Sequence, residues 1–456
     1  MTTIIDKQLS PLPGTKNRIR YIDRLVCVVL ALASLGMVLW QVPRHTTVSP
    51  VDEYVYIDYL AKVPDQIVVH RGEDVGGYAR SYLACNGVRV LGTFPADMCS
   101  TPPLNDDPRL PNSGMTSADL YTPLYFVATR VMAQPLVTLG VADLTEAGRI
   151  SGWTWLAAAA ILLYLSLRRW KVPIVVASGV SLLMIGSLPA YWSNTYVSTD
   201  ATGLLSGALM LFAATLVVER KKFGIFLFTA SAVLLPLFKL QNIMAVSVAA
   251  LFLLIVAGVN AYRASPRMRS RINSFLKDAW TRTAVAAVIG AVVAQGLWLI
   301  IRDLIAVGPA PDQGISIPIS IKALIGEFFK YVPGVGTGAL DPNAFGFGSW
   351  LAAVLMTWAI VGGIFGLLLA AKKGSHAEAL AIASITVALL AGPILAFMIV
   401  ITDGFYFTMP ARYGISLLPF FLACLALLFA RKTWLGYLVP VIGVVSYLAV
   451  LRIPVG

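Results

Sequence analysis

Charged side chains are scarce in this sequence: Asp, Glu, Lys and Arg make up only 13% of the 456 residues, against about 25% in soluble domains. The sequence also has only four cysteines and three histidines, and it contains no Cys-x-x-Cys, His-Glu-x-x-His or glycine-rich phosphate loop. Apolar residues make up 58% of the chain, and the mean hydropathy is +0.78. This balance excludes a soluble enzyme, a disordered chain and a disulfide-stapled small protein, and it indicates an all-α polytopic membrane protein.

Apolar runs of membrane-spanning length recur along the chain, and we predict about eleven transmembrane helices. The first run follows a basic stretch but has no small-residue cleavage site after Trp40, so we interpret it as an uncleaved anchor. The fifth run is the shortest and contains Pro236. The predicted spans cover residues 25–43, 149–167, 172–191, 200–218, 223–238, 242–260, 283–305, 349–371, 378–401, 413–430 and 434–451.

Basic residues are distributed unevenly between the predicted loops. With the N-terminus placed in the cytoplasm, the inner segments carry 21 of the 35 Lys and Arg residues but only five of the 23 Asp and Glu residues. This asymmetry follows the positive-inside rule, and it accounts for the net charge of +12 without a nucleic acid partner. We therefore predict a multi-pass protein of the cytoplasmic (inner) membrane with its N-terminus inside.

The predicted loops also differ in length. Two long loops, at about residues 44–148 and 306–348, face outward, and loops of this length usually carry function. The functional residues are therefore expected to face outward. Between a cytoplasmic segment at 1–24 and a C-terminal helix and tail at 431–456, we assign residues 25–430 to one membrane domain.

The first outer loop contains Cys85 and Cys99. The outer compartment of a bacterium is oxidising, so we predict that these two cysteines form a disulfide. Two free thiols are the alternative.

Two further outer segments are typical of helices at a membrane surface rather than across it. Residues 319–332 show apolar side chains at helical spacing, with Lys322 and Glu327 on the opposite, polar face. Residues 120–140 are apolar but are broken by proline, at Pro135 among others. We therefore expect neither segment to span.

Three acidic residues stand where a predicted span meets the outer side. Asp52 and Glu53 adjoin each other just beyond the first span, and carboxylates so near lipid are costly unless they are paired or used. A carboxylate there can accept a proton from a sugar hydroxyl as a general base; an ordinary polar loop is the alternative. Asp200 is the only acidic residue between 147 and 218, and its alternative role is that of a helix N-cap.

Two cations are predicted at the same outer rim. Lys239 is the only charge between two apolar runs, and Arg412 precedes Tyr413 at the outer mouth of the tenth span. A guanidinium fork and an ammonium group together suit a phosphate. The alternative is that both side chains snorkel to lipid headgroups.

The order and sidedness of these residues resemble the C-superfamily of integral-membrane glycosyltransferases (GT-C). That superfamily includes protein O-mannosyltransferases, lipid A aminoarabinose transferases and actinobacterial arabinofuranosyltransferases. Its early features are an acidic pair outside the first helix, a long first outer loop with a His-x-Pro-Pro-Leu-Tyr-Tyr-like segment, and an Arg-Leu-like start to the second span. The corresponding segments here are Asp52-Glu53, Tyr121-Thr122-Pro123-Leu124-Tyr125-Phe126 and Gly148-Arg149-Ile150.

Later segments extend the resemblance over about residues 25–430. Asp200 resembles the acidic head of a later helix, Lys239-Leu240-Gln241-Asn242 a Lys-Gln-like turn, and Arg412-Tyr413 a late Arg-Tyr pair. Leu120 occupies the place of the family's His and Thr122 that of one proline. No role of that His is therefore carried over.

The resemblance implies a sugar donor linked to a polyprenyl monophosphate. Its sugar would pass, with inversion, to a hydroxyl of an envelope glycan, lipid or protein acceptor. In that scheme Asp52 is the general base and Glu53 the second catalytic carboxylate. Lys239 and Arg412 bind the donor phosphate and stabilise the leaving charge.

The same resemblance implies residues around the sugar. Asp200, Tyr54, Tyr125 and Tyr413 are expected to contact sugar or acceptor. If a divalent cation takes part, its candidate ligands are the carboxylates already named, namely Asp52, Glu53 and Asp200; no other cofactor is expected.

Two alternatives stay open from sequence. One is a non-catalytic transporter or flippase for a lipid-linked sugar, and the other is a polymerase or ligase of envelope glycans. A transporter is expected to carry charges and broken helices at the middle of the bilayer. The marked charges here cluster instead at the outer ends of the predicted helices, which favours chemistry at the membrane surface.

Overall fold

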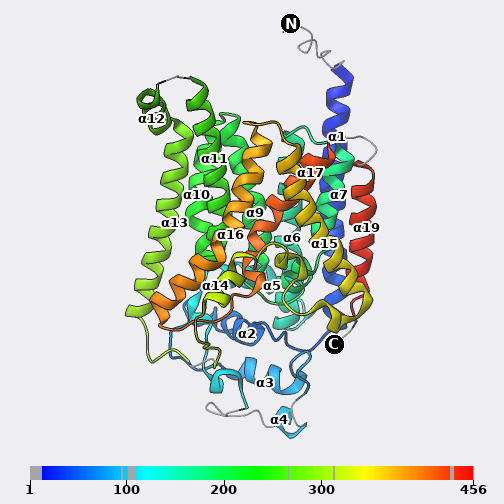
Figure 1. The fold of residues 1–456 in the computed structure, drawn as a ribbon. Coiled ribbons are helices and arrows are strands. Elements are labelled where there is room, and N and C mark those ends of the chain that lie inside the picture. The colour runs from blue at the N-terminus through cyan, green and yellow to red at the C-terminus, as the bar shows by residue number, and fades with distance from the viewer. Residues whose placement is uncertain are drawn as a thin grey trace.

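Long apolar helices run side by side through most of the molecule (Figure 1). The computed structural model describes residues 13–93, 96–100, 109–264, 267–311, 314–431 and 436–454. Within these ranges the chain forms helices and only isolated β-bridges. The predicted all-α class is therefore confirmed for the described part of the chain.

In the described part of the chain, eight helical segments are long and apolar enough to cross a membrane. They correspond to α1 (Pro13–Gln41), α6 (Leu144–Arg169), α9 (Ala201–Val218), α11 (Ile243–Ala264), α13 (Ala279–Leu304), α15 (Gly346–Ala370), α16 (His376–Asp403), and α17 (Leu418–Phe429) with the 3-10 helix η7 (Ala411–Leu417) that leads into it. The chain is therefore a polytopic membrane protein.

Three predicted spans do not meet this test as single straight helices. The third divides into α7 (Ile174–Ile185) and α8 (Leu188–Asn194), which are bent by 54° and reach spanning length only as a pair. The fifth and eleventh are the shorter helices α10 (Lys222–Phe238) and α19 (Leu438–Leu451). The predicted count of eleven spans is therefore not confirmed; eight of the predicted positions meet the test, or nine if the bent pair is one span.

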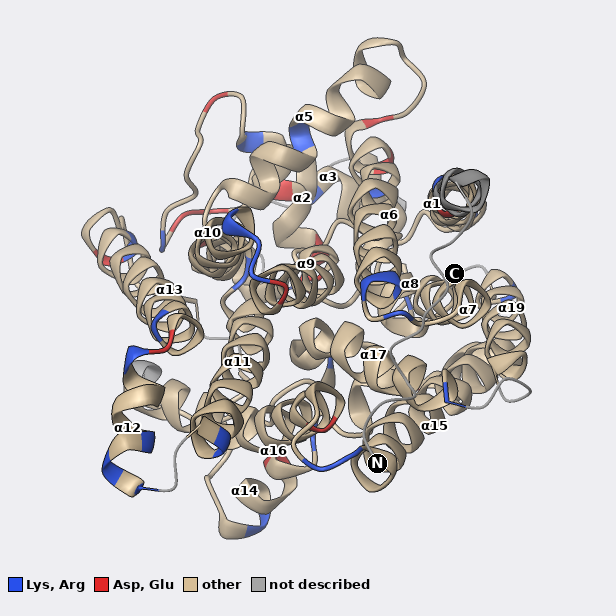
Figure 2. Ribbon diagram, turned by 90° about the horizontal axis from the view of Figure 1, so that it is seen from above, with Lys and Arg blue, Asp and Glu red and all other residues tan. Residues whose placement is uncertain are grey.

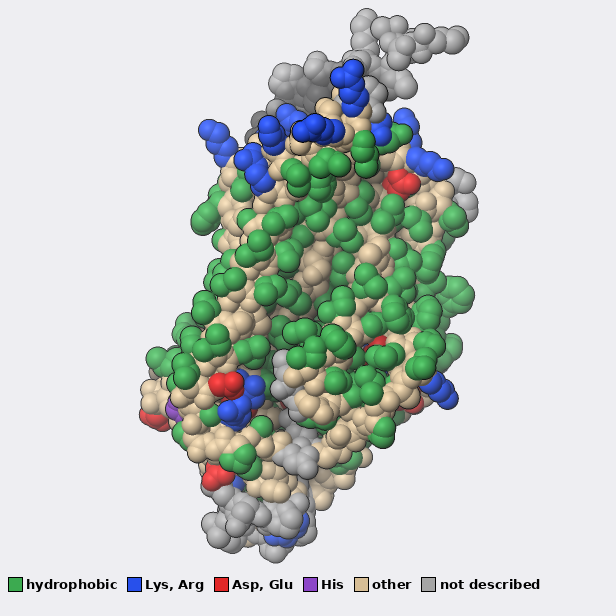
Figure 3. Space-filling view, turned by 60° about the vertical axis from the view of Figure 1, so that its left-hand side comes forward, with side chains coloured by type: hydrophobic (Ala, Val, Ile, Leu, Met, Phe, Trp, Pro, Cys, Tyr) green, Lys and Arg blue, Asp and Glu red, His purple; other side chains and the backbone are tan. Residues whose placement is uncertain are grey.

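The two ends of the bundle differ in character. One end, here called the basic end, carries the short turns and α12 (Met268–Lys277); Lys and Arg side chains gather there above a broad apolar band (Figure 3). The opposite end, the loop end, carries α2 (Glu53–Lys62), α3 (Gly77–Asn86), α4 (Ala96–Ser100) and α5 (Leu124–Thr138) (Figure 1).

Close backbone contacts hold η7 against α9 at the loop end. A Cβ atom on Gly207 of α9 would lie 2.3 Å from the Ser416 carbonyl oxygen, and one on Gly203 would lie 2.2 Å from the Ile415 side chain. Small residues allow such close approach between membrane helices. The start of α9 and the segment around η7 are therefore held side by side.

The first outer loop is helical rather than irregular. Cys85 at the end of α3 and Cys99 in α4 form a disulfide. α5 replaces the apolar segment predicted at 120–140, continues through Pro135, and is shorter than a span, as expected. α6 begins at Leu144 rather than at 149, because Asp143 accepts a hydrogen bond from the Glu146 amide (2.8 Å) and caps it.

The disulfide gives a direct chemical prediction. When the unfolded protein is alkylated without reductant, the peptides that contain Cys85 and Cys99 should remain joined and lighter by two hydrogen atoms than the dithiol form. Cys27 and Cys424, which are free thiols, should be alkylated in the same digest and serve as the internal control. Alkylation of Cys85 or Cys99 before reduction would contradict the pairing.

The second outer loop corrects one sequence prediction. The helix predicted at 319–332 is shorter, α14 (Ile321–Phe328), and Glu327 is 1% exposed instead of lying on a polar surface. Its Oε1 atom accepts hydrogen bonds from the Tyr406 hydroxyl (2.8 Å) and the Met409 amide (3.0 Å). These two hydrogen bonds direct Glu327 into the protein. Through them Glu327 anchors the segment that precedes η7.

Candidate functional site

Four charged residues from distant parts of the chain meet at the loop end. Arg412 Nη2 donates to the Asp52 carboxylate at 2.8 Å, and Arg412 Nη1 lies 3.4 Å from Asp200 Oδ2. Lys239 Nζ donates to the other oxygen of Asp200. The order Asp52–Arg412–Asp200–Lys239 alternates in sign, and these four residues are called the charge cluster below.

Asp200 stands at the N-cap position of α9 but does not cap it. Its side chain makes no capping hydrogen bond and turns to the two cations instead. The preceding loop is held by the Tyr125 hydroxyl, which accepts from the Ser198 amide at 3.0 Å. Burial raises the pKa of Asp200, but Lys239 and Arg412 outweigh it and bring the pKa below its ordinary value. Asp200 therefore stays ionised.

Lys239 is directed inward by the way α10 ends. The backbone becomes extended at Lys239 (φ −160°, ψ 127°), whose amide still donates to the Leu235 carbonyl, so the carbonyls after Leu235 lose their helical partners. The Thr122 hydroxyl donates to the Leu237 carbonyl (2.5 Å), and the Asn242 amide donates to the Leu235 carbonyl (3.1 Å). Lys239 is 1% exposed, so the alternative of snorkelling does not describe it. Burial lowers its pKa despite the neighbouring Asp200.

Aromatic rings enclose the two cations. Lys239 Nζ lies 5.4 Å from the ring centre of Tyr413 and 5.9 Å from that of Tyr121, and the Arg412 guanidinium lies 5.3 Å from Tyr413. The Tyr56 hydroxyl donates to the Tyr121 hydroxyl at 3.0 Å. Tyr413 was predicted for the site, whereas Tyr56 and Tyr121 were not.

The tyrosines of α2 show how helical spacing could have found Tyr56. Residues four apart lie on one face of a helix, and residues two apart do not. Tyr56 therefore lies on the same face of α2 as Asp52, the face that is turned toward the charge cluster. Tyr54, the predicted sugar contact, is buried in the apolar cluster beneath α3, where Asp58 and Arg80 are the charges that act on it.

Glu53 takes part in a different, fully buried network. Its Oε1 accepts from Arg149 Nε (2.8 Å) and the Val197 amide (2.9 Å), and its Oε2 accepts from Arg149 Nη2 (2.8 Å) and the Ser49 amide (2.7 Å). A carboxylate has about four acceptor sites, so none is left for a substrate or a cation. Glu53 holds the start of α2, and Asp52 is left as the accessible carboxylate of the pair.

The carboxylates predicted as metal ligands do not converge on a common point. No group of three or more His, Cys, Asp or Glu side chains is arranged to hold a metal ion within the part of the chain that the structure describes. Asp52 and Asp200 instead share Arg412, so a cation between them would have to replace that guanidinium. The side chains present suit an anion better than a divalent cation.

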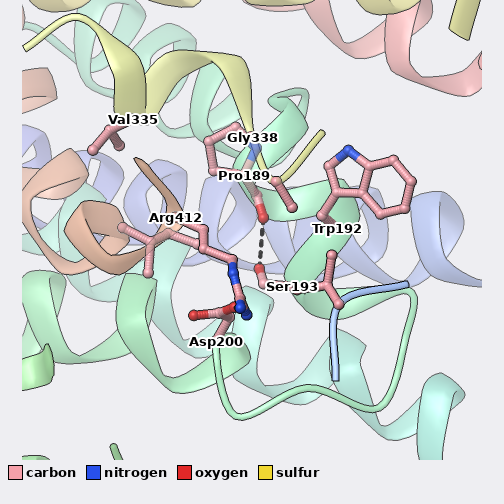
Figure 4. A pocket seen from close by; sticks show the side chains of 10 residues that line it. Pro189, Trp192, Ser193, Asp200, Val335, Gly338 and Arg412 are labelled. Carbon is pink, nitrogen blue, oxygen red and sulfur yellow. Dashed lines mark hydrogen bonds and ion pairs between the residues drawn. The ribbon is translucent and has the colours of Figure 1, made fainter. Parts of the chain in front are cut away.

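A cavity of only about 10 Å³ adjoins the cluster, with Asp200 and Arg412 on one side and Trp192 on another (Figure 4). Such a volume holds about one water molecule, far below the several hundred Å³ of a small-molecule pocket. Gly338 closes the cavity, since a Cβ there would lie 2.9 Å from both Leu188 and Trp192. A molecule larger than water could enter this cavity only if the wall of 335–339 moved.

The fold and site together define a multi-pass membrane protein with a buried, charge-balanced cluster at the end that carries its long loops. Comparison of the chain with protein-family models, with curated proteins and with solved structures finds no match. The function is therefore inferred from the chemistry of the cluster and from the order of its residues along the chain.

Proposed function

We propose that this protein is a membrane glycosyltransferase of the GT-C type, which transfers a sugar from a polyprenyl-phosphate donor to a hydroxyl of an envelope glycan, lipid or protein. The observation that supports this most is the convergence of Asp52, Asp200, Lys239 and Arg412 from four distant segments. Two carboxylates and two cations are the groups needed to take a proton and to stabilise a leaving phosphate.

The proposed reaction is a single inverting displacement. The acceptor oxygen forms a bond to the anomeric carbon while the bond from that carbon to the phosphate oxygen breaks. The electron pair leaves with the phosphate, and the acceptor proton passes to Asp52. The Asp52 side chain is 42% exposed, against 6% for Asp200, so Asp52 is the carboxylate that an acceptor can reach.

The closed cluster suggests how the donor acts on the base. Arg412 is already shared by Asp52 and Asp200, so a donor phosphate that takes the guanidinium competes with Asp52. Once released, Asp52 is free to accept a proton. Lys239 stays bound to the buried Asp200 and meets the phosphate as a fixed positive charge.

The proposed orientation follows the charge asymmetry. In this orientation the protein lies in the cytoplasmic membrane, with the basic end facing the cytoplasm and the loop end facing outward. Polyprenyl tails would then lie among the helix ends around the charge cluster, with the sugar and phosphate at the rim.

A transporter of lipid-linked sugars is the second candidate, because one structural feature favours it. The bend of 54° between α7 and α8 is a broken helix, and transporters bind substrates at such breaks. α8 also lines the small cavity through Pro189 and Trp192. The charges nevertheless lie at helix ends, which favours the transferase.

The purified protein in lipid nanodiscs should release polyprenyl phosphate from a panel of radiolabelled polyprenyl-phosphate sugars supplied with membrane-derived acceptors. Label appearing in the acceptor supports the transferase, and growth of a glycan chain on the acceptor identifies the polymerase or ligase alternative. Movement of intact donor across the membrane of proteoliposomes, without cleavage of the bond between sugar and phosphate, would support the transporter and overturn the transferase.

The phosphate assignment makes a kinetic prediction. Arg412→Lys keeps the charge but loses the guanidinium fork, and Arg412→Ala loses both. We expect the donor KM to rise by about tenfold or more in Arg412→Ala, since a charge-assisted hydrogen bond is lost, and by less in Arg412→Lys. Lys239→Ala should behave like Arg412→Ala.

The acceptor KM of the same variants is one control, and a cation of the loop end that lies outside the charge cluster is the other. Lys322→Ala in the exposed part of α14 removes the same charge outside the cluster and should leave the donor KM unchanged. An equal donor KM in Arg412→Ala, Lys239→Ala and Lys322→Ala would contradict the phosphate site.

A further inference from the structure

α12 is an amphipathic helix at the basic end that no other part of the described chain buries. It links α11 to α13 at the rim of the bundle (Figure 2). None of its ten residues is buried. Met268, Ile272 and Leu276 recur every fourth residue on one face, and they are 70%, 48% and 58% exposed. Three large apolar side chains in water on a single helical face would be costly.

Cations border this apolar stripe. At 100° per residue, Arg269 lies beside the stripe on one side and Arg271 on the other, while Lys277 faces away from it. Ser270 and Asn273 complete the polar side. This is the pattern of a helix that lies in a membrane interface, with its apolar side chains among acyl chains and its cations at headgroup level.

The charge around α12 is almost entirely positive. Asp278 is the only acidic residue from 261 to 282, and its carboxylate accepts a hydrogen bond from the Trp280 amide (2.7 Å) as the N-cap of α13. The cations of the segment therefore outnumber its acidic residues by six to one. These cations are Arg263, Arg267, Arg269, Arg271, Lys277 and Arg282.

We propose that α12 is a docking site for anionic phospholipids, with the Met268–Ile272–Leu276 stripe inserted at the level of the glycerol and upper acyl chains. Arg269, beside the stripe, contacts phosphate-bearing headgroups, and Lys277, on the polar face, adds attraction to the anionic surface. Two observations carry this: the uncovered apolar stripe and the complementary positive charge beside it. The position of α12 at the ends of two apolar helices places it at the edge of the lipid. The site is independent of the charge cluster, which lies at the opposite end of the bundle.

The test uses the full-length protein in nanodiscs made of phosphatidylcholine alone or of equal parts phosphatidylcholine and phosphatidylglycerol. Native mass spectrometry after mild detergent extraction measures how many phosphatidylglycerol molecules are retained. Each cation near an anionic surface is worth roughly fivefold in binding, so Arg269→Gln with Lys277→Gln should lower the affinity for phosphatidylglycerol by about tenfold or more.

A matched variant removes the same charge at the same end. Lys372 and Lys373 lie exposed in the turn between α15 and α16, away from the α12 stripe, so Lys372→Gln with Lys373→Gln should lower phosphatidylglycerol retention clearly less than the α12 pair does. Leu276→Ser should weaken retention of both lipids, because the stripe inserts regardless of headgroup. Leu276 is 58% exposed, so this variant tests insertion without emptying a packed core position.

Hydrogen exchange of the α12 amides supplies a second measurement. We expect slower exchange in nanodiscs that contain phosphatidylglycerol than in phosphatidylcholine alone, and loss of that difference in the Arg269→Gln and Lys277→Gln variant. Equal retention in both charge variants, or exchange that ignores lipid composition, would overturn the proposal. Protection that instead rises with protein concentration would show a second copy on the stripe and would also overturn it.

Discussion

Replacing Asp52 by asparagine is expected to abolish sugar transfer while leaving the protein folded. Asparagine keeps the size of the side chain but cannot accept the acceptor proton, and loss of a positioned general base lowers turnover by about 10²- to 10⁴-fold. Asp52 makes one partly exposed ion pair with Arg412, and such pairs contribute about 1 kcal/mol or less to stability. The loss should therefore appear in kcat rather than in yield.

The measurement compares kcat, donor KM and thermal midpoint for wild type and variant in the same nanodiscs. Because Arg412 keeps Asp200 as a partner and loses only the competing Asp52 carboxylate, the donor KM should not rise. Asp65→Asn is the matched control: Asp65 lies exposed just beyond α2, so the same chemical change occurs near the same helix but outside the cluster. Wild-type turnover in Asp52→Asn would exclude Asp52 as the base, whatever the outcome for the phosphate site.

An unusual backbone conformation also distinguishes Asp52. Asp52 has φ 61°, in the left-handed region, which costs a non-glycine residue of order 1 kcal/mol and is concentrated at functional sites. Asp tolerates this conformation better than most residues. The strained backbone directs the Asp52 carboxylate to Arg412 while Glu53, the next residue, enters the interior with Arg149.

The composition of the charge cluster was predictable because ionised groups are expensive beside lipid. Each of its four members was singled out as a charge at the outer end of an apolar run, and the structure brings all four together. Sidedness thus reduces a search over the whole chain to a few residues at one rim. It does not determine which carboxylate pairs with which cation.

The sequence did not determine how each helix is rotated about its axis, and so which of two neighbouring residues faces the site. Asp52 and Glu53 are neighbours in sequence, yet one is accessible and the other has no free acceptor site. The resemblance implied Tyr54 as a sugar contact, although helical spacing favours Tyr56, the residue four positions after Asp52. The start of α2 at Glu53, fixed by its contacts with Arg149, decides both outcomes.

Long-range contacts also redirect residues with strong local patterns. The periodicity of 319–332 predicts Glu327 on a polar surface, but the Tyr406 hydroxyl and the Met409 amide draw it inward. Thr122, which departs from the family pattern, donates to a carbonyl at the end of α10 and so helps to direct Lys239. These partners are separated by 79 to 115 residues, and no local pattern encodes them.

The buried ion pair between Glu53 and Arg149 is expected to show the largest effect on folding. Glu53→Gln should lower the free energy of unfolding by about 3–5 kcal/mol, the cost of removing one partner of a buried pair. Glutamine offers one oxygen and one NH₂ group, so its NH₂ would face an Arg149 N–H and a backbone N–H. The remaining Arg149 charge, 2% exposed, would have no compensating anion.

An exposed ion pair at the basic end provides the matched control. Arg169 and Glu219 lie 2.6 Å apart with exposed fractions of 38% and 31%, so Glu219→Gln makes the same substitution in a solvated pair. We expect it to cost less than about 1 kcal/mol. Thermal and urea midpoints in one detergent measure both.

A double-mutant cycle then separates the pair from the surrounding hydrogen bonds. Arg149→Met alone leaves Glu53 charged among two backbone amides and should be as damaging as Glu53→Gln. The double variant removes both charges and should be less destabilised than the sum of the two, with a coupling of about 1–3 kcal/mol. Additive effects would mean that Glu53 acts through its bonds to Ser49 and Val197 alone. Because Val197 lies in the loop between α8 and Asp200, residual activity in the folded fraction of Glu53→Gln tests whether this network also positions the charge cluster.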